Sequence, residues 1–293
     1  MRKVTAQDAD LRLRIGVAGG PATPKEGADD AVRNRTIHAM FECFSFCTET
    51  KQYDCDMIPI SDDNPVRSTS YVTLIVIVLC VLAFLWELSL GSKADGALAV
   101  LGFTPDTLFH PENALSPWLG IPPAGTILTS MFLHAGLLHI AGNMLYLWIF
   151  GNNIEDAMGH FKFAIFYLIC GIAAALTMVL VDPASHTPIV GASGAISGVL
   201  GSYMLLFPRA RIHVVIPLWL LFYPFWIRAV WVVGIWFAMQ LVTAALTPPS
   251  EPGVAWWAHV GGFSAGLLLT PLLKSRDVPF FGPVDHRGPW GRG

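Results

Sequence analysis

Long runs of apolar residues dominate the chain between residues 70 and 273. A helix needs about 20 successive apolar residues to cross a bilayer, and six runs reach or approach that length. They are residues 70–90, 121–150, 163–181, 189–207, 225–246 and 254–273. The pattern therefore predicts an all-α polytopic membrane protein with six transmembrane helices.

A further apolar run, 212–223, matters for topology, because a seventh span would reverse the direction of everything after it. Runs of about 10 to 14 residues are more often re-entrant or interfacial. Pro217 and Pro224 interrupt this one, and Arg211 and Arg228 flank it. We therefore expect a loop on the cytoplasmic side that lies against the membrane.

Basic residues beside the spans predict the orientation, since short cytoplasmic loops carry an excess of Lys and Arg. One set of alternate loops holds only Lys93 as a basic residue, together with several acidic ones. The other set carries Arg67, Lys162, Arg209, Arg211, Lys274 and Arg276. Both termini are thus predicted to be cytoplasmic, with residues 275–293 as a disordered tail.

Residues 1–56 form a polar segment with most of the scattered charges and no signal-peptide core, so we expect them in the cytoplasm. His38, Cys43 and Cys47 lack a second ligand pair at zinc-finger spacing, and we predict no metal site. Five cysteines, two of them within spans, give no disulfide framework and are interpreted as free thiols.

Composition identifies the surroundings of the chain. Hydrophobic residues make up 54% and charged residues only 13%, against roughly 25% charged residues in a soluble domain. The net charge is −3 and no basic run occurs, which argues against a nucleic-acid partner. The lipid bilayer is the partner that this composition requires.

Polar groups are costly in hydrocarbon, so polar residues within spans are candidates for a function. Four stand out here: His139, Asn143, Ser193 and His259. Ser193 and His259 lie about four and five residues below the starts of two spans that run in the same direction. With a rise of 1.5 Å per residue, both lie roughly 6 to 8 Å below the outer surface. A hydroxyl and an imidazole at one depth can form the hydrogen bond that activates a weak nucleophile.

Glycine strips indicate that these two spans approach closely. The fourth span opens with Gly191, Gly194 and Gly198, and the sixth contains Gly261 and Gly262. Such strips are also common packing devices, so simple helix packing is the alternative interpretation of Ser193. The matching depth of a histidine favours catalysis.

His139 and Asn143 are four residues apart, so they share a helix face and can donate to one oxygen. We predict an oxyanion hole; a polar clamp between helices is the alternative. A span that took in the whole second run would bury Asn143 far deeper than Ser193. The helix is therefore expected to begin near residues 134–136, with 121–133 in a long outer loop that dips into the outer leaflet.

These positions resemble the motifs of the rhomboid family over roughly residues 57–273. The tracts 131–139 and 151–156 are also similar to the family, as is Trp236-Phe-Ala-Met-Gln240. The motifs themselves are the H-x-x-x-N element His139-Ile-Ala-Gly-Asn143, the G-x-S-G element Gly191-Ala192-Ser193-Gly194 and the A-H-x-x-G element Ala258-His259-Val260-Gly261-Gly262.

The resemblance implies a six-helix rhomboid-like bundle over residues 57–274 that acts as an intramembrane serine endopeptidase. Its partners would be transmembrane protein substrates, cut near the outer face, and its setting a bacterial inner membrane. Ser193 would attack the scissile carbonyl and His259 would take and return the proton. His139, Asn143 and the Ser193 backbone N–H would hold the oxyanion. The family uses no metal and no cofactor.

Two positions depart from the family pattern. Many relatives carry Trp-Arg where Gly125-Thr126 stand here, and some carry Tyr, stacked on the catalytic histidine, where Ser197 stands. Neither change removes a reacting group, so activity is expected. Residues from Met57 onward resemble the start of bacterial relatives, which leaves residues 1–56 as either a spurious upstream extension or a small regulatory segment.

Two other functions are weaker alternatives. A proteolytically inactive rhomboid-like protein that binds membrane helices normally lacks the serine or the histidine, whereas this chain has both. A transporter could use intramembrane histidine and asparagine along a polar pathway. No inverted repeat is evident in the sequence, which disfavours transport.

Overall fold

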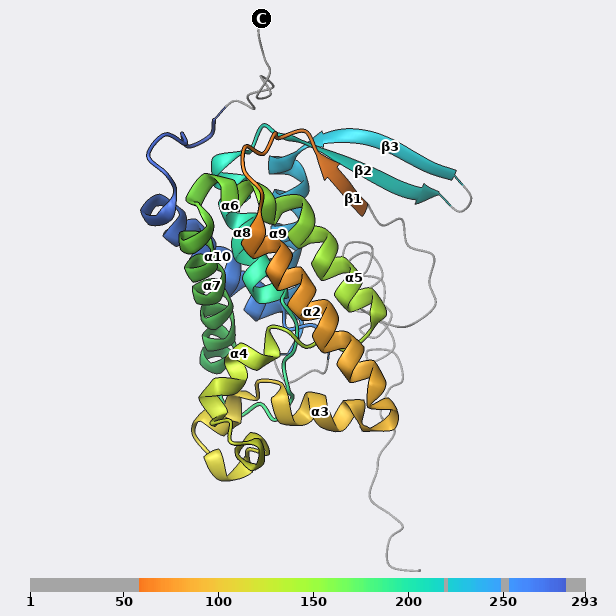
Figure 1. Ribbon diagram of the computed structural model, residues 1–293, viewed down its shortest axis with the longest axis vertical. Coiled ribbons are helices and arrows are strands. Elements are labelled where there is room, and N and C mark those ends of the chain that lie inside the picture. Colours follow the sequence, from red (N-terminus) through yellow and green to blue (C-terminus); the bar gives the residue numbers. More distant parts are fainter. Residues whose placement is uncertain (1–57, 219–220, 249–252, 283–293) are drawn as a thin grey trace, which may run out of the picture. The chain divides into compact units, whose positions relative to one another are not determined.

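The computed structural model of the chain describes residues 58–218, 221–248 and 253–282, and most of them are helical (Figure 1). The predicted segment 1–56 and the residues His38, Cys43 and Cys47 lie outside this part. The helices are α2 (Tyr71–Ser89), α3 (Ala94–Leu101), α4 (Thr126–Ser130), α5 (Leu137–Tyr146), α6 (Asn152–Met158), α7 (His160–Val181), α8 (Ser193–Leu206), α9 (Ala229–Leu246) and α10 (Trp256–Leu273).

By length and composition alone, α2, α7 and α9 are each suited to cross a membrane. The helix α8 is shorter, with 14 residues, and α10 has 18 residues that include Pro271. The segments α5 and α6 are joined by η6 (Leu147–Gly151), a π-helical stretch with helical backbone angles at both ends. The total of six spans therefore stays a prediction.

The start of α5 agrees with the requirement that Asn143 and Ser193 share a depth. The helix begins at Leu137, and the preceding apolar residues form a separate short helix, α4. Ile127, Met131 and Leu133 of this region are nevertheless buried. The remainder of the loop consists of α3 and the short 3₁₀ turns η1 (Gly91–Lys93), η2 (Pro105–Leu108), η3 (Pro111–Asn113), η4 (Ser116–Leu119) and η5 (Pro123–Gly125).

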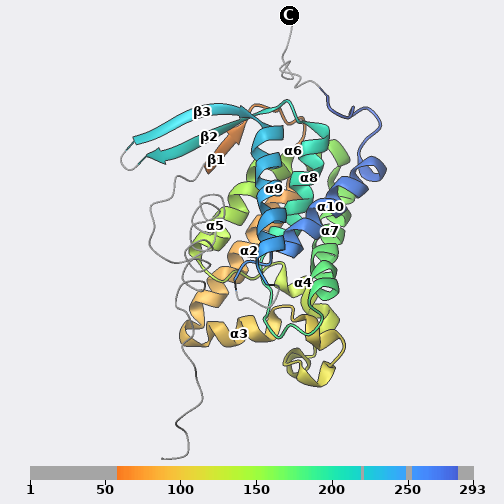
Figure 2. The same ribbon diagram turned by 180° about the vertical axis from the view of Figure 1, so that it is seen from behind.

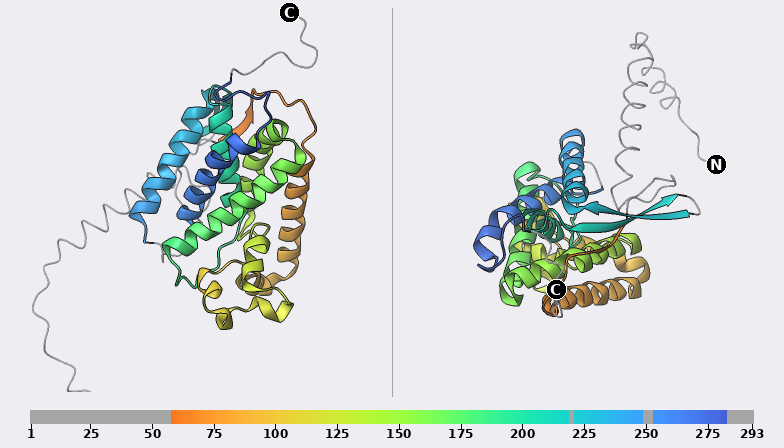
Figure 3. Two further views of the ribbon diagram at one scale, coloured as in Figure 1. Left: turned by 90° about the vertical axis from the view of Figure 1, so that its left-hand side faces the viewer. Right: turned by 90° about the horizontal axis from the view of Figure 1, so that it is seen from above.

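A small sheet corrects the prediction of an all-α protein. Strands β1 (Ile58–Asp62), β2 (Arg211–Leu218) and β3 (Leu221–Arg228) are antiparallel in the order β1-β2-β3, and β2 and β3 extend away from the helices (Figure 3). The apolar run expected to form a loop is thus a hairpin. Its β-branched and aromatic residues favour strands.

Both prolines of this hairpin occupy places where a missing N–H is tolerated. Pro224 lies in the edge strand β3, opposite Val215. Pro217 lies in the central strand β2, but β1 pairs only with Ile212 to Val215. At Pro217 the strand therefore has a partner on the β3 side alone.

The helix α8 is the centre of the packed core. Every residue from Ala195 to Tyr203 is buried, and α8 lies beside α7, α9 and α10 (Figure 2). In contrast, α2 and α7 expose large apolar residues, such as Leu82 and Leu180, of which 57% and 84% are accessible. Such outward apolar faces are typical of helices surrounded by lipid.

A buried carboxylate joins α6 to the start of α2. Glu155 accepts hydrogen bonds from the backbone N–H groups of Val72 and Thr73, at 2.9 and 2.8 Å, and from the Thr73 hydroxyl at 2.7 Å. His160 Nδ1 lies 2.6 Å from the same carboxylate. The first N–H groups of a helix have no partner within it and favour negative charge, so Glu155 stabilises the start of α2.

Asp62 at the end of β1 fixes the sheet to the helices. Its Oδ2 accepts the Tyr203 hydroxyl at 2.6 Å and the Asn153 amide at 2.8 Å. Burial is the largest influence on this carboxyl and raises its pKa to about 6, with a further increase from Asp63 that the two hydrogen bonds partly offset.

The residues directly after α10 make backbone hydrogen bonds to the helices, whereas residues 283–293 of the predicted disordered tail lie outside the described part of the chain. Ser275 N–H donates to the Ala157 carbonyl at 2.8 Å. Phe281 and Gly282 donate to the carbonyls of Leu205 and Leu206, each at 3.1 Å. The last carbonyls of a helix have no partner within it, so the end of α8 offers free acceptors to the tail.

The pKa of Asp62 predicts how stability depends on pH. Because the pKa is higher in the folded chain than in the unfolded one, the protonated carboxyl stabilises the fold fully below about pH 4, and this contribution is lost as the pH rises through about 6. A shift of this size corresponds to roughly 2 to 3 kcal/mol. Unfolding in detergent between pH 4 and 7 should show this decline in the wild type.

Asp62→Asn should remove most of the slope, since the amide stays neutral over the whole range. Asp156→Asn is the control, because this exposed carboxylate contacts only Ser68 among the hydrogen bonds described. Equal slopes in wild type and Asp62→Asn would contradict the assignment of the pH dependence to Asp62.

Candidate active site

The segment before α8 is extended and anchored to the outer loop. Ile189 pairs with Phe103 through two backbone hydrogen bonds of 2.7 and 3.0 Å, and Gly191 N–H donates to the Ser130 carbonyl at 2.9 Å. Gly191 has a φ of +122°, which strongly favours glycine. The helix therefore starts at Ser193 itself, and not four residues earlier as the apolar run suggested.

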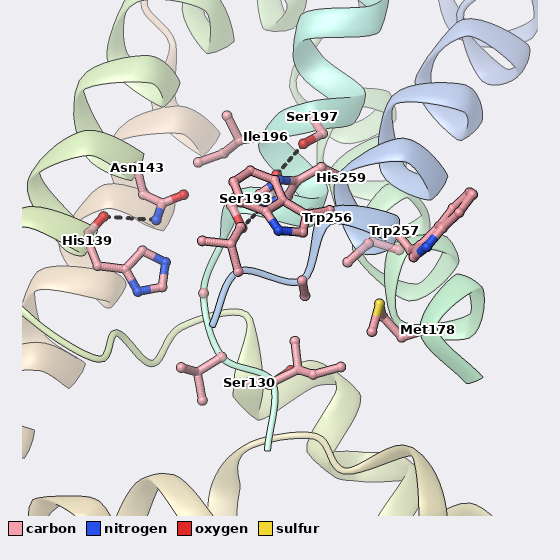
Figure 4. Close-up of a pocket in the computed structure, with 18 of the residues that line it drawn as sticks. Ser130, His139, Asn143, Met178, Ser193, Ile196, Ser197, Trp256, Trp257 and His259 are labelled. Carbon is pink, nitrogen blue, oxygen red and sulfur yellow. Dashed lines mark hydrogen bonds between the residues drawn. The ribbon is translucent and has the colours of Figure 1, made fainter. Parts of the chain in front are cut away.

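Ser193 and His259 meet at the start of their helices, as Figure 4 shows. The distance between Ser193 Oγ and His259 Nε2 is 2.8 Å. His259 is the fourth residue of α10 and Ser193 the first of α8. The two residues predicted from matching depth are thus hydrogen-bonded, although 66 residues separate them in the chain.

Glycines allow this contact by removing the side chains between α8 and α10. A Cβ atom on Gly262 would overlap with the Gly194 carbonyl oxygen, and one on Gly266 with that of Gly198. Both pairs advance in the same direction, so the two helices run parallel, as predicted. The side-chain positions of Gly194, Gly198 and Gly261 face α7 instead, at Ala174, Cys170 and Thr177. A Cβ on Gly191 would lie 2.8 Å from His139 Nε2.

The imidazole of His259 has a second polar partner that the sequence analysis did not identify. Its Nδ1 lies 2.7 Å from Oε1 of Gln240, a residue of α9 whose exposed fraction is 3%. Gln240 is also a polar residue within an apolar run. The criterion that selected Asn143 and Ser193 applied equally to Gln240 and could have found it.

Two indole rings flank His259. The ring centroid of Trp236 lies 6.0 Å from that of the imidazole at an interplanar angle of 37°, and that of Trp256 lies 6.3 Å away, edge to face. Ser197, where some relatives carry tyrosine, is buried and donates to the Ser193 carbonyl at 2.7 Å. The aromatic contact with the histidine therefore comes from other elements in this chain.

The other sequence departure lies further from the reacting groups. Thr126 begins α4, and its hydroxyl donates to the Pro123 carbonyl at 2.6 Å. This local bond stabilises the turn that leads into α4. At Gly125-Thr126, the loop is thus stabilised by a hydrogen bond within the loop itself.

His139 and Asn143 extend from α5 towards Ser193 (Figure 4). His139 Nδ1 accepts the Ala135 backbone N–H at 3.4 Å, so its proton is carried by Nε2. Asn143 Nδ2 donates to the His139 carbonyl at 2.9 Å, and an amide nitrogen has a second proton to donate. Both predicted donors therefore retain an N–H group for a ligand.

The buried side chain of His134 packs against His139. The two imidazole rings are in edge-to-face contact with centroids 5.2 Å apart. His134 is 1% exposed, and its backbone N–H donates to the buried carboxylate of Glu87 at 3.2 Å. His134 thus connects α2 to the candidate oxyanion hole.

A cavity of about 560 Å³ opens onto these groups. Small residues of α7, Gly171, Ala174 and Ala175, form part of its wall, and Ser193, His139 and Asn143 also line it. A hydroxyl paired with an imidazole beside two N–H donors is an arrangement suited to acyl transfer. Among the residues that the structure describes, no cluster of three His, Cys, Asp or Glu side chains could hold a metal.

Alanine in place of glycine should destabilise the protein where the glycine lies in the α8–α10 contact, and not where it faces open space. We expect Gly262→Ala to lower the free energy of unfolding by about 1 to 3 kcal/mol, towards the upper end, because its methyl group would meet backbone and not a movable side chain. Thermal or denaturant unfolding in detergent measures this effect.

Gly234→Ala on α9 is the matched control, since a Cβ there would meet nothing within 4 Å. Alanine should leave stability unchanged or raise it by about 0.5 to 1 kcal/mol, as usual within a helix where the methyl group has room. Equal losses in the two variants would show that α8 and α10 do not depend on this close contact.

Comparison with known proteins gives one family. The family model of the Rhomboid domain matches residues 124–276. RHOMBOID-like protein 4 of Arabidopsis thaliana is 32% identical over 161 residues, which are 55% of this chain and 36% of the plant protein.

Two further relatives differ in their described activity. Rhomboid protease GluP of Bacillus subtilis (strain 168) is 30% identical over 135 residues, 46% of this chain and 24% of that protein. Inactive rhomboid protein 1 of Drosophila melanogaster is 38% identical over 80 residues, 27% of this chain and 6% of the insect protein. The chain thus spans less than half the length of these relatives.

Proposed function

Because this chain belongs to the rhomboid family, we propose that it is an intramembrane serine endopeptidase that cleaves transmembrane-anchored proteins near the outer membrane face. The observation that carries the proposal is the 2.8 Å contact between Ser193 Oγ and His259 Nε2 at the cavity. A serine hydroxyl is a weak nucleophile until a neighbouring base removes its proton.

The reaction follows from the positions of the groups. Ser193 Oγ attacks the scissile carbonyl carbon while its proton passes to His259 Nε2. His259 then returns the proton to the leaving amine, which leaves an acyl ester on Ser193. A water molecule, deprotonated by His259, hydrolyses this ester and releases the second product.

Three donors support the negative oxygen of the tetrahedral intermediate. His139 Nε2 and the second proton of Asn143 Nδ2 come from α5. The Ser193 N–H is in the first turn of α8, where backbone N–H groups have no acceptor within the helix. In enzymes, loss of one such donor costs about a hundred- to a thousandfold in turnover.

The length of α8 supports a site below the membrane surface. Its 14 residues span about 21 Å, whereas the hydrocarbon core is about 30 Å thick. If Leu206 lies at the cytoplasmic boundary, Ser193 lies several ångströms inside the outer one. We therefore propose six spans, α2, α5 to α6, α7, α8, α9 and α10, with the extended segment before Ser193 reaching to the outer face.

An inactive protein that binds membrane helices is the second candidate, since one relative carries that description. Both reacting groups and both oxyanion donors are present here, which favours proteolysis. We further propose a bacterial inner membrane as its setting, with both termini cytoplasmic; one of its relatives, GluP, is bacterial. Helix-breaking residues near the cut are expected in a substrate, because a helical peptide bond is hydrogen-bonded and shielded.

Cleavage of a transmembrane reporter by the purified chain in detergent tests the proposal. The wild type should produce two fragments, and Ser193→Ala and His259→Ala should each lower the rate by at least about a thousandfold, because the dyad members act as a unit. Ser264→Ala and His110→Ala are the matched controls, since Ser264 bonds only to its own helix and His110 is exposed beside Glu112.

Loss of cleavage in both dyad variants, with both controls active, would support the protease and exclude transport. If the folded wild type cuts no reporter of several tried, the inactive binding role becomes the better account. Residual cleavage in Ser193→Ala would contradict the choice of nucleophile.

A further inference from the structure

We propose that Gln240 is a positioning residue for His259: its side-chain carbonyl accepts the Nδ1 proton and thereby holds the imidazole in the tautomer whose Nε2 can deprotonate Ser193. The inference rests on the proposed function and adds a third member to the dyad. Gln240 acts through His259 and does not itself touch the substrate.

The two contacts of the imidazole specify one tautomer. Nδ1 lies 2.7 Å from Gln240 Oε1, and Nε2 lies 2.8 Å from Ser193 Oγ. A neutral imidazole has one N–H and one lone pair. With the amide oxygen as acceptor, Nδ1 carries the proton and the lone pair of Nε2 faces the serine, as a general base requires.

A neutral amide is suited to this position. No Asp or Glu occurs among the described residues that line the cavity, and a carboxylate within a span would be costly. An amide can fix the tautomer without introducing a charge. Cys-His-Asn sites in soluble proteases show that an amide can serve as the third member.

The rest of α9 holds Gln240 in place. Trp236 lies one turn earlier on the same helix face and packs beside the His259 ring. Phe237 stacks on Phe263 of α10 with ring centroids 3.8 Å apart and an interplanar angle of 13°. The helix α9 thus provides one polar and one aromatic contact of His259, and the stacked pair fixes the distance of α9 from α10.

A purely structural role predicts a different pattern of effects. If Gln240 only filled a buried polar position, its replacement would lower stability and leave the turnover of the folded fraction unchanged. If it sets the tautomer, turnover falls while substrate binding and folding stay close to those of the wild type. A buried N–H without an acceptor is strongly disfavoured, so without Gln240 the imidazole proton should move to Nε2.

Three α9 variants separate these cases. Gln240→Met removes the acceptor at similar size, Gln240→Glu keeps an acceptor, and Thr243→Val removes a different buried polar group from the same helix. With a transmembrane reporter, kcat of Gln240→Met should fall about ten- to a hundredfold with KM within about twofold. Gln240→Glu should stay within about fivefold of the wild type, and Thr243→Val should match it.

Nitrogen NMR of protein labelled with ¹⁵N-histidine observes the tautomer directly. The resonance missing from His259→Ala assigns the His259 signals. The wild type should show a protonated Nδ1 and a bare Nε2, and Gln240→Met should show the reverse. This measurement on the wild type needs no substitution at Gln240, so it still decides the tautomer if Gln240→Met fails to fold.

These experiments distinguish an error about Gln240 from an error about the protease activity. If the wild type cleaves, both dyad variants are inactive and folded Gln240→Met turns over like the wild type, Gln240 is not a positioning residue although the protease stands. A wild type with a protonated Nε2 would also overturn the inference, because the amide nitrogen would then face Nδ1. If no reporter is cleaved by the wild type, the proposed function fails first.

Discussion

Backbone meets backbone where α8 packs on α10, because Gly262 and Gly266 lie directly against the backbone of Gly194 and Gly198. This contact determines the distance between the starts of the two helices, and hence the 2.8 Å between Ser193 and His259. Without a hydrophobic driving force between helices in lipid, close packing of small residues is the main means of holding such a geometry. The proposed chemistry therefore depends on residues that have no reactive group.

Hydrogen bonds at both ends of the bundle hold the elements around this pair in place. At the end of the bundle remote from the reacting pair, Glu155 joins α6 to α2, and Asp62 joins β1 to Tyr203 of α8. On the other side, the segment before Ser193 is bonded to Phe103 and Ser130 of the outer loop. The reacting groups thus lie on rigid helices, while the cavity beside them is lined partly by loop residues.

Much of the site was predictable, because residues that hydrocarbon disfavours are conspicuous in an apolar sequence. Depth and glycine spacing brought Ser193 and His259 together, and the depth of Asn143 predicted where α5 begins. The hairpin β2–β3 was missed because a short apolar run has no period that separates strand from loop, and β1, its partner, lies some 150 residues earlier. Gln240 is equally conspicuous as a polar residue in an apolar run, but its partner could not be predicted, because its contact with His259 depends on the packing of α9 against α10.

Covalent labelling with a fluorophosphonate, followed by mass spectrometry of the peptides, tests most directly whether Ser193 is activated by His259. In the folded wild type, the label should be found on Ser193 and on no other serine, and His259→Ala should slow labelling by about a hundredfold or more, as expected when a general base is lost. Labelling at another serine, or equal rates in wild type and His259→Ala, would contradict the central role of this pair.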